Sequence, residues 1–158
     1  MKFESIRGLR LPKIGFGTWR IGGEARPDPS MEESSRKALV SALELGYTHF
    51  DTAEYYAAGH AEELLAEAIR ETHTQRESLF ITSKVSPEHF RSSDLRKSCE
   101  NSLRRLQTEY LDLYLLHWPN PLIPLAEPFK ALSQLMREGK INHVGVSNFK
   151  LNDLKKSI

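Results

Sequence analysis

Four side chains that can exchange or hold protons follow apolar runs of this chain. Asp51 ends the run "YTHFD", Tyr56 comes shortly afterwards, Lys84 lies near the end of "LFITSKV", and His117 follows "LDLYLL". A carboxylate, a phenol, an ammonium and an imidazole are groups that enzymes use for proton transfer. If the fold brings these four side chains together, the pattern indicates an acid–base site.

The chemistry open to the four groups together is proton donation to a carbonyl oxygen. A free phenol has a pKa near 10, about three units above neutral pH, and this difference corresponds to about 4 kcal/mol. A lysine ammonium about 4 Å away supplies roughly that much stabilisation at an effective dielectric constant of about 20. A carboxylate keeps such an ammonium charged, so Asp51 would hold Lys84 protonated and Lys84 would acidify Tyr56. His117, as a neutral imidazole, would donate a hydrogen bond that positions the substrate oxygen.

Each of these residues also has a simpler structural interpretation. Asp51 with Glu54, and Ser147 with Asn148, fit the positions of helix caps. A tyrosine in such a place is more often a packed aromatic with an outward hydroxyl, a lysine at the end of an apolar strand usually extends its ammonium to water, and a histidine is more often a hydrogen-bonded core residue than a catalyst. The joint pattern favours chemistry, because four successive junctions each carry a titratable or amide-bearing group.

The elements that must position these groups alternate between strands and helices. Five apolar runs are typical of strands, at residues 14–19, 47–53, 79–85, 111–118 and 141–149. Amphipathic segments between these runs predict helices, as expected for parallel strands joined by crossovers. Ser30 and Glu33 predict a capping box at the start of the first helix. Gly46 and Gly139 predict the ends of the first and fourth helices.

Two architectures fit this alternation: an open doubly wound sheet, or part of a (β/α)8 barrel. The polar residues favour the barrel, because the carboxyl ends of all its strands meet at one mouth. In an open sheet the site would instead lie at a topological switch point. We therefore predict a partial TIM barrel with about five of the eight parallel strands. Residues 1–158 would form the N-terminal portion of one barrel domain, with a β-hairpin over 2–14 as an end cap and βα units over 15–158.

The composition, 39% hydrophobic and 27% charged over 158 residues, is that of an ordinary globular domain. The net charge of +1 argues against a nucleic-acid-binding protein, which needs a strong basic patch. No apolar run approaches the roughly 20 residues of a membrane span, and no signal peptide is recognisable. The single cysteine, Cys99, allows no internal disulfide, so we expect a cytoplasmic protein. The histidine spacing predicts no metal site.

Six motifs resemble those of the aldo-keto reductase superfamily and occur in that family's order. They are "GFGTW" (15–19), "DTAEYY" (51–56), "GHAEELLAEAI" (59–69), "ITSKV" (81–85), "LDLYLLHWP" (111–119) and "VGVSNF" (144–149). The resemblance covers the whole chain. It implies a (β/α)8 barrel that reduces an aldehyde or ketone to an alcohol with NADPH, without metal or flavin. The sequence does not exclude NADH.

The resemblance also implies the site residues. As catalytic residues it implies Asp51, Lys84, His117 and, as the general acid, Tyr56. As cofactor-binding residues it implies Gly17, Thr18, Asp51, Ser147 and Asn148. As substrate-binding residues it implies Trp19, His117 and Trp118. Two alanines, Ala57 and Ala66, stand where many family members have glycine.

The chain is shorter than a complete barrel, which takes about 250 residues. Much of the family's cofactor cradle would therefore lie outside it, and two open sheet edges predict self-association. One alternative is a non-catalytic fragment or regulatory subunit of the same superfamily. Another is a Schiff-base aldolase that uses Lys84 as its nucleophile, although Asp51 and Tyr56 favour a charged lysine.

Overall fold

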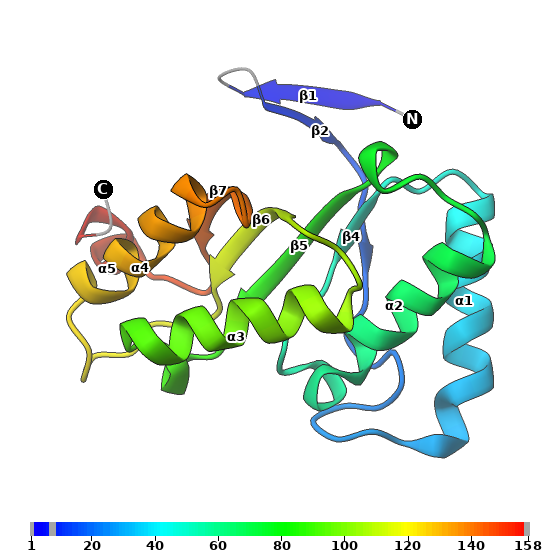
Figure 1. The fold of residues 1–158 in the computed structure, drawn as a ribbon, viewed down its shortest axis with the longest axis horizontal. Coiled ribbons are helices and arrows are strands. Elements are labelled where there is room, and N and C mark those ends of the chain that lie inside the picture. The colour runs from blue at the N-terminus through cyan, green and yellow to red at the C-terminus, as the bar shows by residue number, and fades with distance from the viewer. Residues whose placement is uncertain (1, 7–8, 157–158) are drawn as a thin grey trace.

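The computed structural model describes residues 2–6 and 9–156, which form a small hairpin and a larger parallel sheet. The hairpin pairs β1 (Phe3–Ile6) with β2 (Leu9–Pro12) in antiparallel register. The larger sheet contains, in spatial order, β3 (Phe16–Gly17), β4 (His49–Asp51), β5 (Phe80–Val85), β6 (Leu111–Leu116) and β7 (Ile141–Val146). All its strand pairs are parallel (Figure 1).

A helix follows each strand of the parallel sheet. The helices are α1 (Glu32–Glu44), α2 (His60–Glu71), α3 (Ser92–Arg105), α4 (Ala126–Arg137) and α5 (Leu151–Lys156). The spatial order of the strands is the same as their order in the chain. A doubly wound sheet reverses its order at a switch point, whereas a barrel does not. The parallel sheet is therefore a segment of a (β/α)8 barrel, as predicted.

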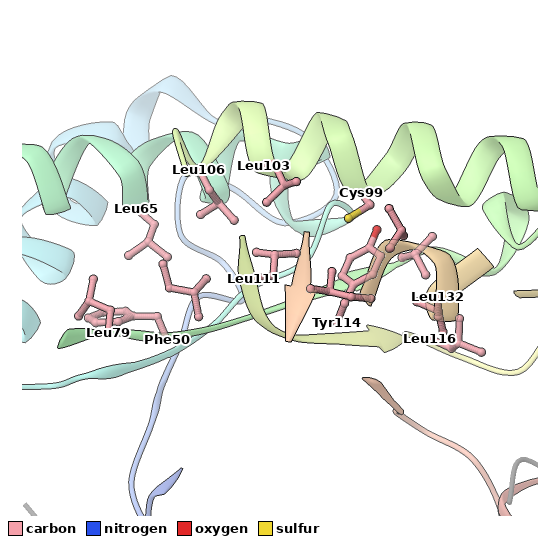
Figure 2. Packing of buried hydrophobic residues seen from close by; sticks show 14 of the residues in the cluster. Phe50, Leu65, Leu79, Cys99, Leu103, Leu106, Leu111, Tyr114, Leu116 and Leu132 are labelled. Carbon is pink, nitrogen blue, oxygen red and sulfur yellow. The ribbon is translucent and has the colours of Figure 1, made fainter. Parts of the chain in front are cut away.

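The hydrophobic core lies between the sheet and its helices. Tyr114 and Leu116 are fully buried, whereas Leu113 and Leu115 point to the other face and are only half-buried. Burial raises the pKa of the Cys99 thiol to about 12, so Cys99 stays protonated and packs as a small apolar side chain. Figure 2 labels the core residues Phe50, Leu65, Leu79, Cys99, Leu103, Leu106, Leu111, Tyr114, Leu116 and Leu132.

The helix ends confirm one prediction and correct another. Gly46 and Gly139 follow α1 and α4 with φ of 84° and 71°, the left-handed conformation in which glycine ends a helix. The Ser30–Glu33 capping box is wrong. Asp28 Oδ1 instead accepts hydrogen bonds from Ser30 N (3.0 Å) and Ser30 Oγ (2.7 Å). The bond from Ser30 N caps a 3-10 turn at Pro29–Met31 that precedes α1. The Ser30 hydroxyl donates to Asp28 and therefore does not cap α1.

The hairpin lies at the amino ends of the parallel strands (Figure 1). Its base borders the turn between α1 and β4, where Lys2, Lys13, Leu45 and Tyr47 line a hollow of about 510 Å³. Residues 7 and 8, between β1 and β2, lie outside the described residues. None of the helices in the described ranges is long and apolar enough to cross a bilayer.

Candidate active site

Lys84 is the centre of a polar cluster at the carboxyl end of the sheet. Its Nζ donates hydrogen bonds to Asp51 Oδ1 (2.5 Å), to Thr52 O (2.8 Å) and to Tyr56 Oη (3.1 Å). An ammonium has three N–H groups, and all three have partners here. The lysine is only 5% exposed, and a charge so deeply buried needs such pairing. The structure thus brings Asp51, Tyr56 and Lys84 together.

Strand register explains why the carboxylate and the ammonium meet. Asp51 is aligned with Thr82 in the β4–β5 ladder, and Lys84 follows two residues later. Residues two apart on a strand point to the same face, so Thr82 and Lys84 both face the barrel interior. His49, two residues before Asp51, lies on this face as well, with its Nε2 3.2 Å from Thr82 Oγ1. The tyrosine comes from the loop that follows β4.

His117 follows β6 and faces the same cluster. Its ring centroid lies 5.6 Å from that of Tyr56 and 3.5 Å from that of Trp118, on which it stacks. Its backbone N donates to Val85 O (3.0 Å). Burial, with the Lys84 charge as the second cause, lowers the pKa of His117 to about 4, so the imidazole is neutral at pH 7. Its buried Nδ1 has no hydrogen-bond partner among the residues that the structure describes.

Acid should destabilise the fold through His117. Its pKa is about 4 when folded and 6.5 when exposed, so between these values the unfolded chain binds more protons. The free energy of unfolding should therefore fall by about 3 kcal/mol between pH 7 and pH 4 because of this one residue. Urea unfolding of the wild-type protein and of a His117→Gln variant measures this contribution as the difference between their pH dependences. Parallel pH profiles of the two proteins would contradict a buried neutral histidine.

Aromatic rings form a wall beside Tyr56. The indole of Trp19 stacks on Tyr55 at 6.0 Å with an interplanar angle of 11°, and lies edge-on to Tyr56 at 5.1 Å. Trp118 lies edge-on to Tyr55 at 5.7 Å. The two predicted tryptophans are therefore joined through Tyr55, a residue that the sequence analysis did not single out. Its position beside Tyr56 in the motif "DTAEYY" was the available signal.

The residues predicted for cofactor binding lie in two places: Gly17 and Thr18 at the end of β3, and Ser147 and Asn148 after β7. Thr18 is fully buried, and its N and Oγ1 both donate to Asp51 O (2.9 and 3.2 Å), so it ties the end of β3 to β4. Gly17 pairs with Asp51, and a side chain added there would meet no atom within 4 Å. Asn148 Nδ2 donates to His117 O (2.9 Å) and Ser147 Oγ (3.1 Å). These contacts hold Ser147 and Asn148 beside the end of β6.

Glu54 has a place in the site that differs from its predicted capping role. Its Oε1 accepts from Ser86 N (2.7 Å) and lies 2.9 Å from His89 Nδ1. Its own N donates to Lys84 O (3.3 Å). Because Asp51 pairs with Lys84 and Glu54 reaches the loop after β5, these two carboxylates are not a capping box. Glu54 instead ties the loop that carries Tyr56 to the strand that carries Lys84.

The fold and the location of the cluster define a class of protein. The polar side chains gather at the carboxyl ends of the strands of a (β/α)8 barrel segment, the end at which barrel enzymes carry their active sites. The Aldo/keto reductase family model matches residues 13–157. The chain belongs to the aldo/keto reductase family.

Individual relatives agree with this assignment. The chain is 36% identical to the aldo-keto reductase YhdN of Bacillus subtilis, covering 98% of the chain and 49% of that protein. It is 42% identical to the methylglyoxal reductase YeaE of Escherichia coli, covering 93% of the chain and 49% of that protein. The chain spans about half the length of the curated relatives it matches.

Solved structures of the family superpose closely on the chain. The thermostable aldo-keto reductase Tm1743, solved with the inhibitor epalrestat, gives a TM-score of 0.95 at 49% identity, over 100% of this chain and 58% of that one. An aldo-keto reductase from Klebsiella pneumoniae in complex with NADPH gives a TM-score of 0.81 at 42% identity, over 99% of this chain and 53% of that one.

Proposed function

We propose that the protein containing this chain reduces an aldehyde or ketone to an alcohol, with a hydride from NADPH and a proton from Tyr56. The observation that carries the proposal is the set of three hydrogen bonds from Lys84 Nζ to Asp51, Thr52 and Tyr56. Membership of the aldo/keto reductase family supports the same reaction class.

The direction of the Lys84–Tyr56 hydrogen bond suits Tyr56 to act as the acid. Tyr56 Oη accepts from Lys84 Nζ, so the phenolic hydrogen is free to point away from the lysine, toward a carbonyl oxygen. When that proton moves to the carbonyl oxygen, the adjacent ammonium stabilises the phenolate that remains. Asp51 keeps the ammonium charged throughout. Solvent then returns a proton to the phenolate.

His117, Trp19 and Trp118 suit the substrate side of the reaction. A neutral imidazole can donate a hydrogen bond to the carbonyl oxygen and so orient it toward Tyr56. The two indoles, with Tyr55 between them, offer an apolar wall for the rest of a small carbonyl compound. Methylglyoxal is the first substrate to test, because several of the relatives are named as methylglyoxal reductases.

The residues present fit one end of a nicotinamide cofactor. The open space over Gly17 leaves room for a ring or ribose beside Asp51. Ser147 and Asn148 carry a hydroxyl and an amide, which are complementary to a carboxamide group. NADPH would supply the hydride that the carbonyl carbon receives. The NADPH complex of the Klebsiella pneumoniae relative favours NADPH over NADH.

The aldolase alternative has less support. Imine formation needs a neutral amine with a free lone pair. Lys84 Nζ instead donates to three oxygens, one of them a carboxylate oxygen at 2.5 Å. This is the pattern of a protonated ammonium, whose role is electrostatic.

We also propose that residues 1–158 are the N-terminal portion of a single barrel domain. The edge strands of the described sheet are β3 and β7, and the relatives are about twice as long as the chain. Further βα units would pair with both edges and cover the half-buried Leu113 and Leu115. Without those units the same edges would favour self-association.

An assay of NADPH oxidation by the full-length protein tests the proposed function. We expect methylglyoxal-dependent loss of NADPH absorbance with one alcohol formed per NADPH consumed, and slower turnover with NADH. NADPH binding without turnover would point to the non-catalytic alternative. An adduct trapped on Lys84 by borohydride would point to the aldolase.

A further inference from the structure

The turn that carries Tyr56 has an unusual backbone. Ala57, Ala58 and Gly59 have φ of 49°, 54° and 94°, so three consecutive residues are left-handed and two of them are not glycine. L-residues adopt this conformation rarely, and it persists where the surrounding structure imposes it. The surroundings of this turn therefore contribute to the position of Tyr56.

The side chain of Arg105, on α3, packs against this turn. A Cβ added at Gly59 would lie 2.5 Å from Arg105 Nε and 2.8 Å from its Cδ, so the arginine side chain packs directly on this glycine. Arg105 Nε donates to Glu62 Oε2 (2.7 Å), and its Nη2 donates to Ser102 Oγ (3.2 Å). The guanidinium is thus fixed by a carboxylate of α2 and a hydroxyl of α3.

Glu62 continues this network to the strand that carries Lys84. Its side chain is 0% exposed, and its second oxygen, Oε1, accepts from Ser83 Oγ (2.5 Å). Ser83 directly precedes Lys84 on β5. A chain of contacts therefore runs from Gly59 through Arg105 and Glu62 to β5.

We propose that Glu62 and Arg105 are positioning residues, a buried ion pair that holds Tyr56 Oη against Lys84 Nζ. This inference rests on the proposed function, because it assigns the pair a role in the same proton transfer. Neither residue faces the cluster of Asp51, Tyr56 and Lys84; they act through the backbone of the turn and through β5. A displacement of about 1 Å at a reacting group costs on the order of 100-fold in rate, so a loosened turn should lower turnover.

The test replaces Glu62 with glutamine in the full-length protein. The variant keeps the shape and the hydrogen bond to Ser83 but loses the charge that pairs with Arg105. The chain offers a matched control in the ion pair of Arg76 with Asp112, whose Nη2–Oδ2 distance is also 2.7 Å. Those side chains are 16% and 15% exposed, and they lie at the amino end of β6, away from Tyr56.

We expect both Glu62→Gln and Asp112→Asn to lower the melting temperature, but only Glu62→Gln to lower kcat, by about 10- to 100-fold. KM and NADPH affinity should change less than twofold. Wild-type kcat in Glu62→Gln, or equal losses of kcat in both variants, would overturn the positioning role. If Glu62→Gln does not fold, Arg105→Lys provides a second test, because a lysine keeps the charge but loses the planar packing on Gly59; we expect it to lower kcat as well, and wild-type kcat would overturn the positioning role.

The wild-type protein distinguishes this inference from the proposed function. A wild-type protein that binds NADPH but reduces no carbonyl compound would refute the function, and with it the role of the ion pair. An active wild type with an inactive Tyr56→Phe variant and a fully active Glu62→Gln variant would refute the positioning role alone.

Discussion

Replacing Tyr56 with phenylalanine in the full-length protein should lower kcat for carbonyl reduction by about 10²- to 10⁴-fold, the range typical of a lost general acid. The substitution removes only the hydroxyl that accepts from Lys84 Nζ at 3.1 Å. The ring, and its edge-on contact with Trp19, should stay in place. Steady-state kinetics with methylglyoxal give the effect, and fluorescence titration with NADPH shows whether cofactor binding survives.

The neighbouring Tyr55 provides the control for this variant. Tyr55→Phe removes the same atom one residue earlier, from a ring that stacks on Trp19 at the rim and is 39% exposed. We expect its kcat to stay within about threefold of the wild type, because no proton is transferred from it. A Tyr56→Phe enzyme as active as Tyr55→Phe would mean that another group supplies the proton.

The meeting of Asp51 and Lys84 could be predicted from sequence because it depends on a regular geometry. Alternating strands and helices imply parallel strands, and parallel strands bring their carboxyl ends to one side. The apolar runs mark those ends to within a few residues, although β4 extends only over His49–Asp51 rather than 47–53. The cluster therefore follows from the periodicity of the chain and does not need its detailed packing.

Glu62 and Arg105 could not be paired in the same way. They are 43 residues apart and lie on different helices, and a charged residue in a helix usually faces solvent. The only local signal is the spacing of Glu62 from Leu65 and Ile69, which places a carboxylate on an apolar stripe. Such a stripe predicts that the carboxylate is buried but does not identify its partner.

Ala57 is a second feature that residue patterns leave open. The family resemblance notes only that alanine stands here where many members have glycine. In the structure its φ is 49°, a conformation in which a Cβ is unfavourable by roughly 1–2 kcal/mol. Ala57 N donates to Glu24 O at 2.6 Å, a contact between two loops. Tertiary contacts of this kind set the backbone of the turn, and they are not encoded in local sequence.

Replacing Lys84 with methionine should lower kcat by about 10³-fold. The ammonium stabilises the phenolate that forms when Tyr56 gives up its proton, by about 4 kcal/mol at a separation of about 4 Å and an effective dielectric constant of about 20. Methionine has a similar volume, and the carboxylate left behind, Asp51, is 36% exposed and can be hydrated. The variant should therefore remain folded, with only a small drop in melting temperature, while its kcat falls. Lys97→Met, at an exposed position of α3, is the matched control and should retain wild-type kcat.

A double variant separates the role of Asp51 from that of Lys84. Asp51 is proposed to act on the phenol through the lysine, to which it is hydrogen-bonded at 2.5 Å. Once Lys84 is methionine, removing the charge of Asp51 should cost nothing further, because two groups that act as a unit are not additive. An unpaired carboxylate beside a forming phenolate is unfavourable, so Asp51→Asn in the Lys84→Met background should even restore part of the lost kcat. A double variant far slower than Lys84→Met would contradict an effect of Asp51 on turnover that runs only through Lys84, and would assign the further loss to its expected contact with the cofactor.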